Sequence, residues 1–341
     1  NFEIPIQLIN SKFKHVRLKG KNMYKNITKF LMLISLILVL LNSCSKEKTE
    51  KQIVIGASLL TMQDDFYITL NQGLLDEAAA ADLKIKVISR NADFKLGKQI
   101  ADIEDFVQQG IDLLIVSPVS PTAIGPTIDE VDRKGIPVVT VDIRSEEGNV
   151  RTHVMSDDME AGRICARFIA EQLQGEGEIG IVTHPTMTSG INRVIGFREV
   201  MQNYPKIRIL AELNAESSRE KSMSLMEDLL MSHPEVDYVL GINDVMTLGA
   251  MASIEGAGRI ADVKAVMICG GQKEAFDRFK ANDPCLKGAA LIYPYTIGKN
   301  AIAAAIDILN GKAVPKEILV PVKLLTAENV VELEAEWRKK E

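Results

Sequence analysis

The sequence contains few of the residues from which catalytic and metal sites are usually built. Its 341 residues include 4 cysteines and 4 histidines, and it has neither a G-x-S-x-G nucleophile elbow nor a G-x-x-x-x-G-K-[ST] phosphate loop. The cysteines lack metal-type spacing. His184 follows an apolar run and could line a site, but we favour a loop histidine without a special role. We therefore expect a protein that is not an enzyme, with no catalytic residues, no metal and no cofactor.

An excess of basic residues is absent as well. Asp and Glu number 46 against 40 Lys and Arg, which gives a formal net charge of −6. Nucleic-acid binding depends on clustered Lys and Arg that neutralise phosphates. The charge balance therefore predicts no nucleic-acid partner.

Two glycine runs resemble a dinucleotide-binding loop by letters alone. Gly175–Gly180 matches G-x-G-x-x-G, and Gly256-Ala257-Gly258 followed by Ala261 nearly does. The dinucleotide motif needs a loop that follows a strand and opens a helix, so that helix N–H groups face a pyrophosphate. Both runs are expected to follow a helix and precede a strand. We interpret them as turns that end helices.

The longest apolar run is too short to cross a bilayer, which requires about 20 residues. It extends from Phe30 to Leu41, follows Lys25 and Lys29, and leads into Leu41-Asn42-Ser43-Cys44. A charged segment, a short apolar segment and a small residue before a cysteine are typical of a secreted lipoprotein. We therefore expect Cys44 to carry the lipid, with an ordinary signal peptide or a membrane anchor as the alternatives.

We expect three segments within the first 52 residues. Residues 1–22 are interpreted as an upstream extension of the reading frame, residues 23–43 as the signal peptide and residues 44–52 as a polar tether. This organisation places the protein in the cell envelope, on the outer side of the membrane and attached to it through the lipid alone.

Beyond the tether, short apolar runs alternate with segments of helical period. Runs that are apolar throughout are typical of parallel strands covered by helices on both faces. About ten strands are many for one open sheet, so we expect an α/β protein of two doubly wound parallel-sheet lobes. The expected strands are Ile53–Ser58, Ile85–Ser89, Leu113–Ser117, Pro137–Asp142, Glu178–Thr183, Ile207–Leu213, Tyr238–Ile242, Val263–Cys269 and Lys287–Ile292.

The two halves have no linker rich in Pro, Gly or Ser between them. The chain is therefore expected to change lobe through short crossovers, which favours a hinge. Val320–Leu325 is predicted as a last strand and Ala327–Lys340 as a charged terminal helix. His153 is expected in an edge strand.

Polar and aromatic residues follow the carboxyl ends of these strands. In open α/β sheets that edge carries the ligand crevice. A polyhydroxylated ring can stack on aromatic faces there while Asp, Asn and Arg bind its hydroxyls. Each residue also has a structural alternative: Asp65 and Asp244 can cap helices, and Arg193 can be a solvated cation. The candidates are Asp64, Phe66, Tyr67, Ser117, Asp142, Arg144, Asp158, Arg193, Asn243, Gly270 and Tyr293.

At these positions the sequence resembles the ribose-binding type of periplasmic binding protein, over about residues 53–325. The resemblance implies lobes formed by residues 53–156 with 293–318 and by residues 157–292 with 319–326, three crossovers between them, and a helical tail at residues 327–341. The segments that carry it are Asp64–Tyr67, Ser117-Pro118, Lys134–Asp142, Ser156–Asp158 with Gly162, and Asn243–Ala250.

The resemblance also implies roles for individual residues. Phe66 and Tyr67 would sandwich a sugar, Asp142 would accept hydrogen bonds from its hydroxyls, and Arg193 and Asn243 would bind it from the second lobe. Asp64 stands where relatives often have Asn, and Asp158 follows the crossover between lobes.

Several positions depart from the family pattern. Ile143 separates Asp142 from Arg144 where relatives have Arg directly after the Asp, and Ser117 replaces a frequent Asn. Cys269 and Gly270 stand in place of an aromatic–Asp pair. The Gln that relatives usually have near Tyr293 is missing. We therefore expect a hexose, a polyol or another small polar solute rather than ribose.

This resemblance implies a solute-binding component of an ABC importer. The ligand would favour a closed form that a permease recognises. The alternative is a sensory protein that presents its closed form to a chemoreceptor or a sensor kinase.

Overall fold

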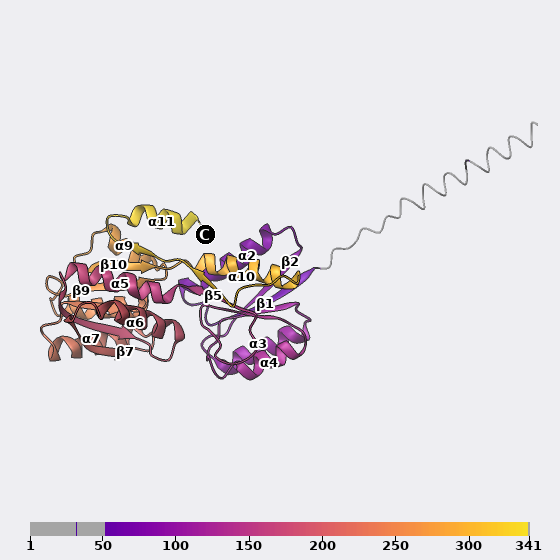
Figure 1. Cartoon of the computed structure of the whole chain (residues 1–341), viewed down its shortest axis with the longest axis horizontal. Coiled ribbons are helices and arrows are strands. Elements are labelled where there is room, and N and C mark those ends of the chain that lie inside the picture. The colour runs from indigo at the N-terminus through magenta and orange to yellow at the C-terminus, as the bar shows by residue number, and fades with distance from the viewer. Residues whose placement is uncertain (1–31, 33–51, 340–341) are drawn as a thin grey trace, which may run out of the picture. The chain divides into compact units, whose positions relative to one another are not determined.

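The computed structural model describes residues 52–339 together with Met32 (Figure 1). Cys44 and, apart from Met32, the expected signal peptide lie outside the described residues. No helix in the described part of the chain has the length and apolar character that a membrane span requires.

The first lobe is a six-stranded parallel sheet with helices on both faces. Its strand order is β11-β5-β4-β3-β1-β2. Helices α2 and α10 lie on one face and α3 and α4 on the other (Figure 1). The strands are β1 (Ile53–Leu59), β2 (Ile85–Asn91), β3 (Leu113–Val116), β4 (Val138–Val141), β5 (Thr152–Ser156) and β11 (Glu317–Val320). The helices are α2 (Asp65–Ala80), α3 (Leu96–Gln108), α4 (Gly125–Arg133) and α10 (Pro294–Leu309).

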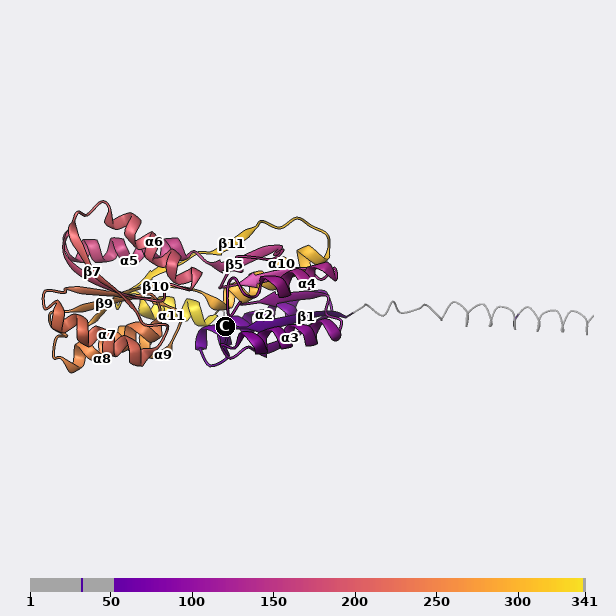
Figure 2. The ribbon, with the colours of Figure 1, turned by 90° about the horizontal axis from the view of Figure 1, so that it is seen from below.

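The second lobe repeats this plan with the order β12-β10-β9-β8-β6-β7. Its strands are parallel except for β12, which pairs antiparallel with β10. Helices α5 and α6 cover one face of the sheet and α7 and α8 the other (Figure 2). The strands are β6 (Glu176–Thr183), β7 (Lys206–Asn214), β8 (Tyr238–Gly241), β9 (Lys264–Cys269), β10 (Leu286–Leu291) and β12 (Lys323–Leu325). The helices are α5 (Asp158–Gln172), α6 (Thr188–Met201), α7 (Arg219–Ser232), α8 (Asp244–Gly256), α9 (Lys273–Lys280) and α11 (Val330–Lys339).

The central strands show why the apolar runs are unbroken. Every residue of β3, β4 and β8 is buried, because helices cover both faces of a parallel sheet. The prediction of two doubly wound α/β lobes is therefore confirmed. The second glycine run lies as expected, between the end of α8 and the start of β9. The first is a turn only at Gly175, because Gly177 and Gly180 already belong to β6. Neither run opens a helix.

The chain passes between the lobes three times, after β5, after β10 and between β11 and β12. The last crossover corrects one expectation, because Val320–Leu325 is not a single strand. Leu319 and Val320 pair with Met155 and Ser156 in the first sheet, while Lys323–Leu325 pairs in the second. The boundary at residue 318 thus lies two residues too early.

The position of β5 corrects a second expectation. β11 pairs along its outer side, so β5 is not an edge strand. His153 is buried in it, and the His153 Nδ1 and Thr140 Oγ1 atoms are 2.9 Å apart. β11 supplies this edge from a distant part of the sequence, which local patterns do not reveal.

In each lobe, paired helices make backbone contact through glycines. A Cβ atom at Gly73 of α2 would lie 2.1 Å from the Tyr295 carbonyl oxygen, and one at Gly298 of α10 would lie 2.1 Å from that of Leu70. In the second lobe, α5 and α6 meet in the same way through Gly162 and Gly196. Only glycine permits such close approach.

Candidate ligand-binding site

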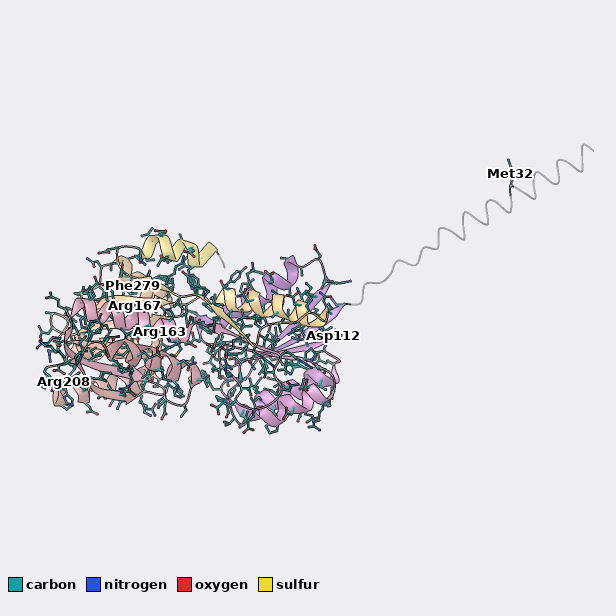
Figure 3. The ribbon with its side chains drawn as sticks, in the orientation of Figure 1. Met32, Asp112, Arg163, Arg167, Arg208 and Phe279 are labelled. Atoms are coloured by element: carbon teal, nitrogen blue, oxygen red, sulfur yellow. The ribbon has the colours of Figure 1, made fainter. Side chains whose placement is uncertain are left out.

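The carboxyl ends of the two sheets face a common cavity of about 710 Å³, within the usual range for small-molecule sites. Asp112, beside the amino end of β1, and Arg208, near the amino end of β7, lie at the outer ends of their lobes (Figure 3). The strands therefore point inward. Seven predicted residues line the cavity: Asp64, Phe66, Tyr67, Asp142, Arg193, Asn243 and Gly270.

The wall from the first lobe begins at the amino end of α2. Asp64 is the N-cap, because its side chain accepts a hydrogen bond of 3.0 Å from the Phe66 N–H. The expectation that Asp65 caps the helix is therefore wrong. The centroids of the Phe66 and Tyr67 rings are 5.0 Å apart and the rings meet edge to face. No gap lies between two facing rings, so the implied sandwich of a sugar between them is wrong.

Tyr67 connects this helix to the strand ends. Its hydroxyl donates to Asp142 Oδ2 at 2.6 Å and accepts from Ser117 Oγ at 3.4 Å. Ser117 is fully buried and does not line the cavity. It lies behind Tyr67 and orients that hydroxyl rather than facing a ligand.

Asp142 has an unusual backbone conformation and a raised pKa. Its φ of 60° lies in the left-handed region, which Asp and Asn tolerate better than most other residues. Its side chain is 8% exposed. Burial raises the pKa of Asp142 to about 7, although the Tyr67 hydrogen bond and the charge of Arg193 oppose the shift.

Two predicted residues of the first lobe and its crossover do not reach the cavity. Arg144 turns outward and forms an ion pair of 2.5 Å with Glu317 of β11, so Ile143 lines the cavity in its place. Tyr293 is buried at the start of α10, while its neighbour Ile292 faces the cavity. β11 supplies the carboxylate that redirects Arg144, and its position could not be read from the local sequence.

Arg193 of α6 supplies the positive charge in the wall from the second lobe. It is 7% exposed, its Nε donates to Asp158 Oδ1 at 2.8 Å, and its Nη1 donates to the Ile242 carbonyl at 2.8 Å. Burial lowers the pKa of Arg193, but Asp158 and Asp142 outweigh it and raise the pKa above its ordinary value. Asp158 lies behind Arg193 and does not line the cavity.

The close contact between α5 and α6 fixes the place of this arginine. A Cβ atom at Gly162 would lie 1.9 Å from the Arg193 carbonyl oxygen. Asp158 precedes Gly162 by one turn of α5, which brings its carboxylate to the guanidinium. The Arg193 side chain is therefore fixed by hydrogen bonds to Asp158 and the Ile242 carbonyl, and it is not a solvated cation.

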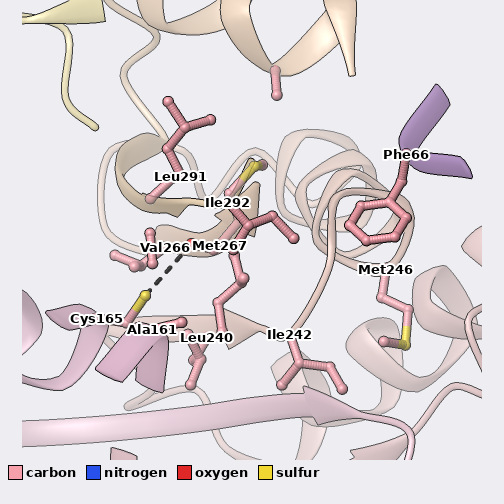
Figure 4. Packing of buried hydrophobic residues seen from close by; sticks show 14 of the residues in the cluster. Phe66, Ala161, Cys165, Leu240, Ile242, Met246, Val266, Met267, Leu291 and Ile292 are labelled. Carbon is pink, nitrogen blue, oxygen red and sulfur yellow. Dashed lines mark hydrogen bonds between the residues drawn. The ribbon is translucent and has the colours of Figure 1, made fainter. Parts of the chain in front are cut away.

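The third group lies at the ends of β8 and β9. Asn243 caps α8 by accepting from the Met246 N–H at 2.9 Å, so the expectation that Asp244 is the cap is wrong. Asp244 Oδ2 instead accepts from the Gly270 N–H at 2.6 Å. A Cβ atom at Gly270 would lie 3.3 Å from the Phe66 ring, so this glycine admits an aromatic ring from the opposite lobe. Phe66 belongs to the same buried apolar cluster as residues of the second lobe, among them Met246 (Figure 4).

Several lining residues were missed by the sequence argument. Phe94 follows β2, and Glu216 and Ser217 follow β7; all three have left-handed φ values between 50° and 56°. The rule about carboxyl strand ends applies to these two strands as well and would have found them. His184 lines the cavity as well, with its Nδ1 3.0 Å from Ser217 Oγ, so the alternative that it lines a site is the correct one. Within residues 52–339, no three His, Cys, Asp or Glu side chains form a group that could hold a metal ion.

Residues 55–313 match the model of the periplasmic binding protein domain. The chain belongs to this family. Its resemblance to the ribose-binding type is confirmed by the ribose import binding protein of Bacillus subtilis (strain 168), which is 33% identical over 308 residues, covering 86% of this chain and 97% of the relative. The xylitol-binding protein of Mycolicibacterium smegmatis is 29% identical and covers 81% of this chain, with 78% of its own length aligned.

Solved structures of other periplasmic binding proteins share the two-lobed fold. An ABC transporter solute-binding protein from Bacillus halodurans C-125 with bound myo-inositol matches with a TM-score of 0.77 and 26% identity, covering 85% of this chain and 99% of that one. A fructose-binding periplasmic domain of a hybrid two-component system matches with the same TM-score and identity, over 84% of this chain and 95% of its own.

Proposed function

We propose that this protein binds a small sugar or polyol between its lobes, outside the cytoplasm, and delivers it to an ABC-type permease. One observation carries the proposal: Tyr67 and Asp142 from one lobe and Arg193 from the other line the same cavity. A ligand that contacts both sides stabilises the closed arrangement, because it gains contacts there that an open form cannot provide.

The lining residues suit a polyhydroxylated ligand. The ring faces of Phe66 and Tyr67 can stack against its C–H surfaces. Asp142, Asp64 and Asn243 can accept hydrogen bonds from hydroxyls, and Arg193 can donate to them. Ser117 and Asp158 act through their neighbours Tyr67 and Arg193. We assign no ligand contact to Arg144 or Tyr293.

The relatives support this ligand class, since their names include ribose and xylitol and one related structure holds myo-inositol. They also support a location outside the cytoplasm, to which we add Cys44 as the proposed lipid anchor. A sensory role is the second candidate, because one structural neighbour belongs to a hybrid two-component system. Stimulation of a reconstituted permease ATPase by the loaded protein would distinguish import from sensing.

Calorimetric titration with pentoses, hexoses and polyols tests the proposal, together with small-angle scattering. Binding should be accompanied by a smaller radius of gyration. Asp142→Asn should weaken binding at least tenfold, because a charged acceptor is lost. Arg144→Ala, two residues away but turned outward, should leave affinity within twofold. Absence of binding and compaction with every compound would refute the proposal, and a tenfold loss in Arg144→Ala would refute this assignment of the site.

A further inference from the structure

Negative charge on the wall from the first lobe is not offset by that lobe. Among the described residues that line the cavity, Arg193 of the second lobe is the one Lys or Arg. The first lobe contributes Asp64, Asp142 and Glu146 and no cation, because Arg144 is held outside by Glu317.

Asp64 and Asp142 are bound by neutral donors. Asp64 accepts from the Phe66 N–H, and Asp142 Oδ2 accepts from the Tyr67 hydroxyl. Neither carboxylate forms an ion pair within residues 52–339, and in that range Asp142 Oδ1 receives no hydrogen bond. Asp142 is 8% exposed and Asp64 is partly buried. A carboxylate buried as far as that of Asp142 in a cavity wall is costly unless a partner satisfies it.

Arg193 cannot provide this compensation fully. Its Nε is bound to Asp158 and its Nη1 to the Ile242 carbonyl, so its charge is already shared with a carboxylate of its own lobe. Two groups on the rim do not change the balance. Glu216 is paired with Lys221 at 2.8 Å, and burial lowers the pKa of His184, which keeps it neutral.

Resting on the proposed function, we infer that the ligand is an aminated sugar or polyol whose protonated amino group binds between Asp64 and Asp142. Asp64 caps the helix that carries Tyr67, and Asp142 accepts from the Tyr67 hydroxyl. Both carboxylates lie close enough to act electrostatically on Tyr67. An ammonium group there forms charge-assisted hydrogen bonds, which are about twice as strong as neutral ones. The neighbouring faces of Phe66 and Tyr67 add cation–π attraction.

A neutral hydroxyl in the same position fulfils only half of this requirement. It donates a hydrogen bond to one carboxylate, but it adds no positive charge to a wall whose negative charge Arg193 offsets only in part, in a site that closure removes from water. An ammonium group has three donors and a positive charge, so it can satisfy both carboxylates together. The remaining hydroxyls of the ligand then lie toward Arg193 and Asn243.

Matched compounds test the inference by calorimetry at pH 7.5. Hexosamines are compared with the parent hexoses, and 1-amino-1-deoxysorbitol with sorbitol. At least one amine should bind ten times more tightly than its hydroxyl parent. Asp64→Asn should reduce that preference at least fivefold, since Asn keeps the helix cap and loses the charge. The matched control is Asp65→Asn, which removes the same charge from an exposed neighbour outside the cavity and should keep the preference unchanged.

Each outcome separates this inference from the proposed function. Parents that bind as tightly as their amines would overturn the amino-group inference and leave sugar or polyol binding intact. A preference that survives Asp64→Asn, or that is lost equally in Asp65→Asn, would overturn the assigned position of the amino group. No binding of either set would contradict the proposed function itself.

Discussion

Asp142 combines a left-handed backbone conformation, a raised pKa and a position in the wall of the ligand cavity. Its left-handed φ aims the carboxylate from the end of β4 toward Tyr67, and its burial makes ionisation costly. The left-handed backbone and the buried carboxyl group are both unfavourable, and they occur at a residue that lines the ligand cavity. Strained backbone of this kind tends to cluster at functional sites.

The raised pKa of Asp142 predicts how stability depends on pH. The unfolded chain loses this proton near 3.8 and the folded chain near 7, so between these values the folded state holds more protons. The contribution of Asp142 to the free energy of unfolding must therefore decrease as pH rises through this window. Asp142→Asn keeps a residue that tolerates the backbone conformation and removes the titration.

In urea unfolding at pH 8 without ligand, Asp142→Asn should be more stable than wild type by roughly 2–4 kcal/mol, at about 1.4 kcal/mol for each pKa unit. At pH 4 the difference should nearly vanish. Asp64 and Asp158 also have raised pKa values, so the comparison with wild type isolates Asp142. A constant difference across the pH range would contradict the prediction.

Helix pairs set the geometry of each lobe at the scale of elements. Gly73 and Gly298 let α10, which returns from the second lobe, pack against α2 at backbone distance. Gly162 and Gly196 do the same for α5 and α6 and thereby position Arg193. The helices that carry Phe66, Tyr67 and Arg193 are thus among those fixed by glycine contacts.

Gly298→Ala should destabilise the protein by about 2–4 kcal/mol, because its Cβ would lie 2.1 Å from the Leu70 carbonyl oxygen and force the helices apart. The matched control is Gly97→Ala in α3, where no atom lies within 4 Å. It should be neutral or stabilising by about 0.5 kcal/mol. Urea unfolding measures the free energy of unfolding of both variants. If Gly298→Ala changed it no more than Gly97→Ala does, α2 and α10 could move apart without loss of stability.

At the scale of the whole molecule, α11 contacts both the loop after β9, at Gly271, and the crossover after β10, at Ile292. Trp337, 4% exposed, donates from Nε1 to the Ile292 carbonyl at 3.0 Å. Its ring covers Gly271, where a Cβ atom would lie 2.0 Å away and φ is 106°. Gly270, Gln272 and Ile292 all line the cavity, so α11 braces two parts of the site from behind.

Trp337→Phe should weaken ligand binding several-fold, since it keeps an aromatic ring on Gly271 and removes the hydrogen bond to the crossover. Trp337 is the chain's single tryptophan, and its fluorescence should change when ligand closes the cleft in the wild type. Val331→Ala, at a position of α11 that is 73% exposed, is the control and should bind normally. A lower melting temperature with unchanged affinity would show that α11 supports the fold alone.

The sequence by itself determined the two α/β lobes, because unbroken apolar strands and alternating helices leave few other arrangements. It also determined which strand ends supply Asp64, Phe66, Tyr67, Asp142, Arg193, Asn243 and Gly270 to the cavity, since strand ends follow from local patterns. Tertiary structure decided what those patterns do not contain. β11, from the far end of the chain, covers β5 and draws Arg144 away, and Asp158 is brought behind Arg193. These contacts join residues distant in sequence, so only the folded chain fixes the charge of the cleft.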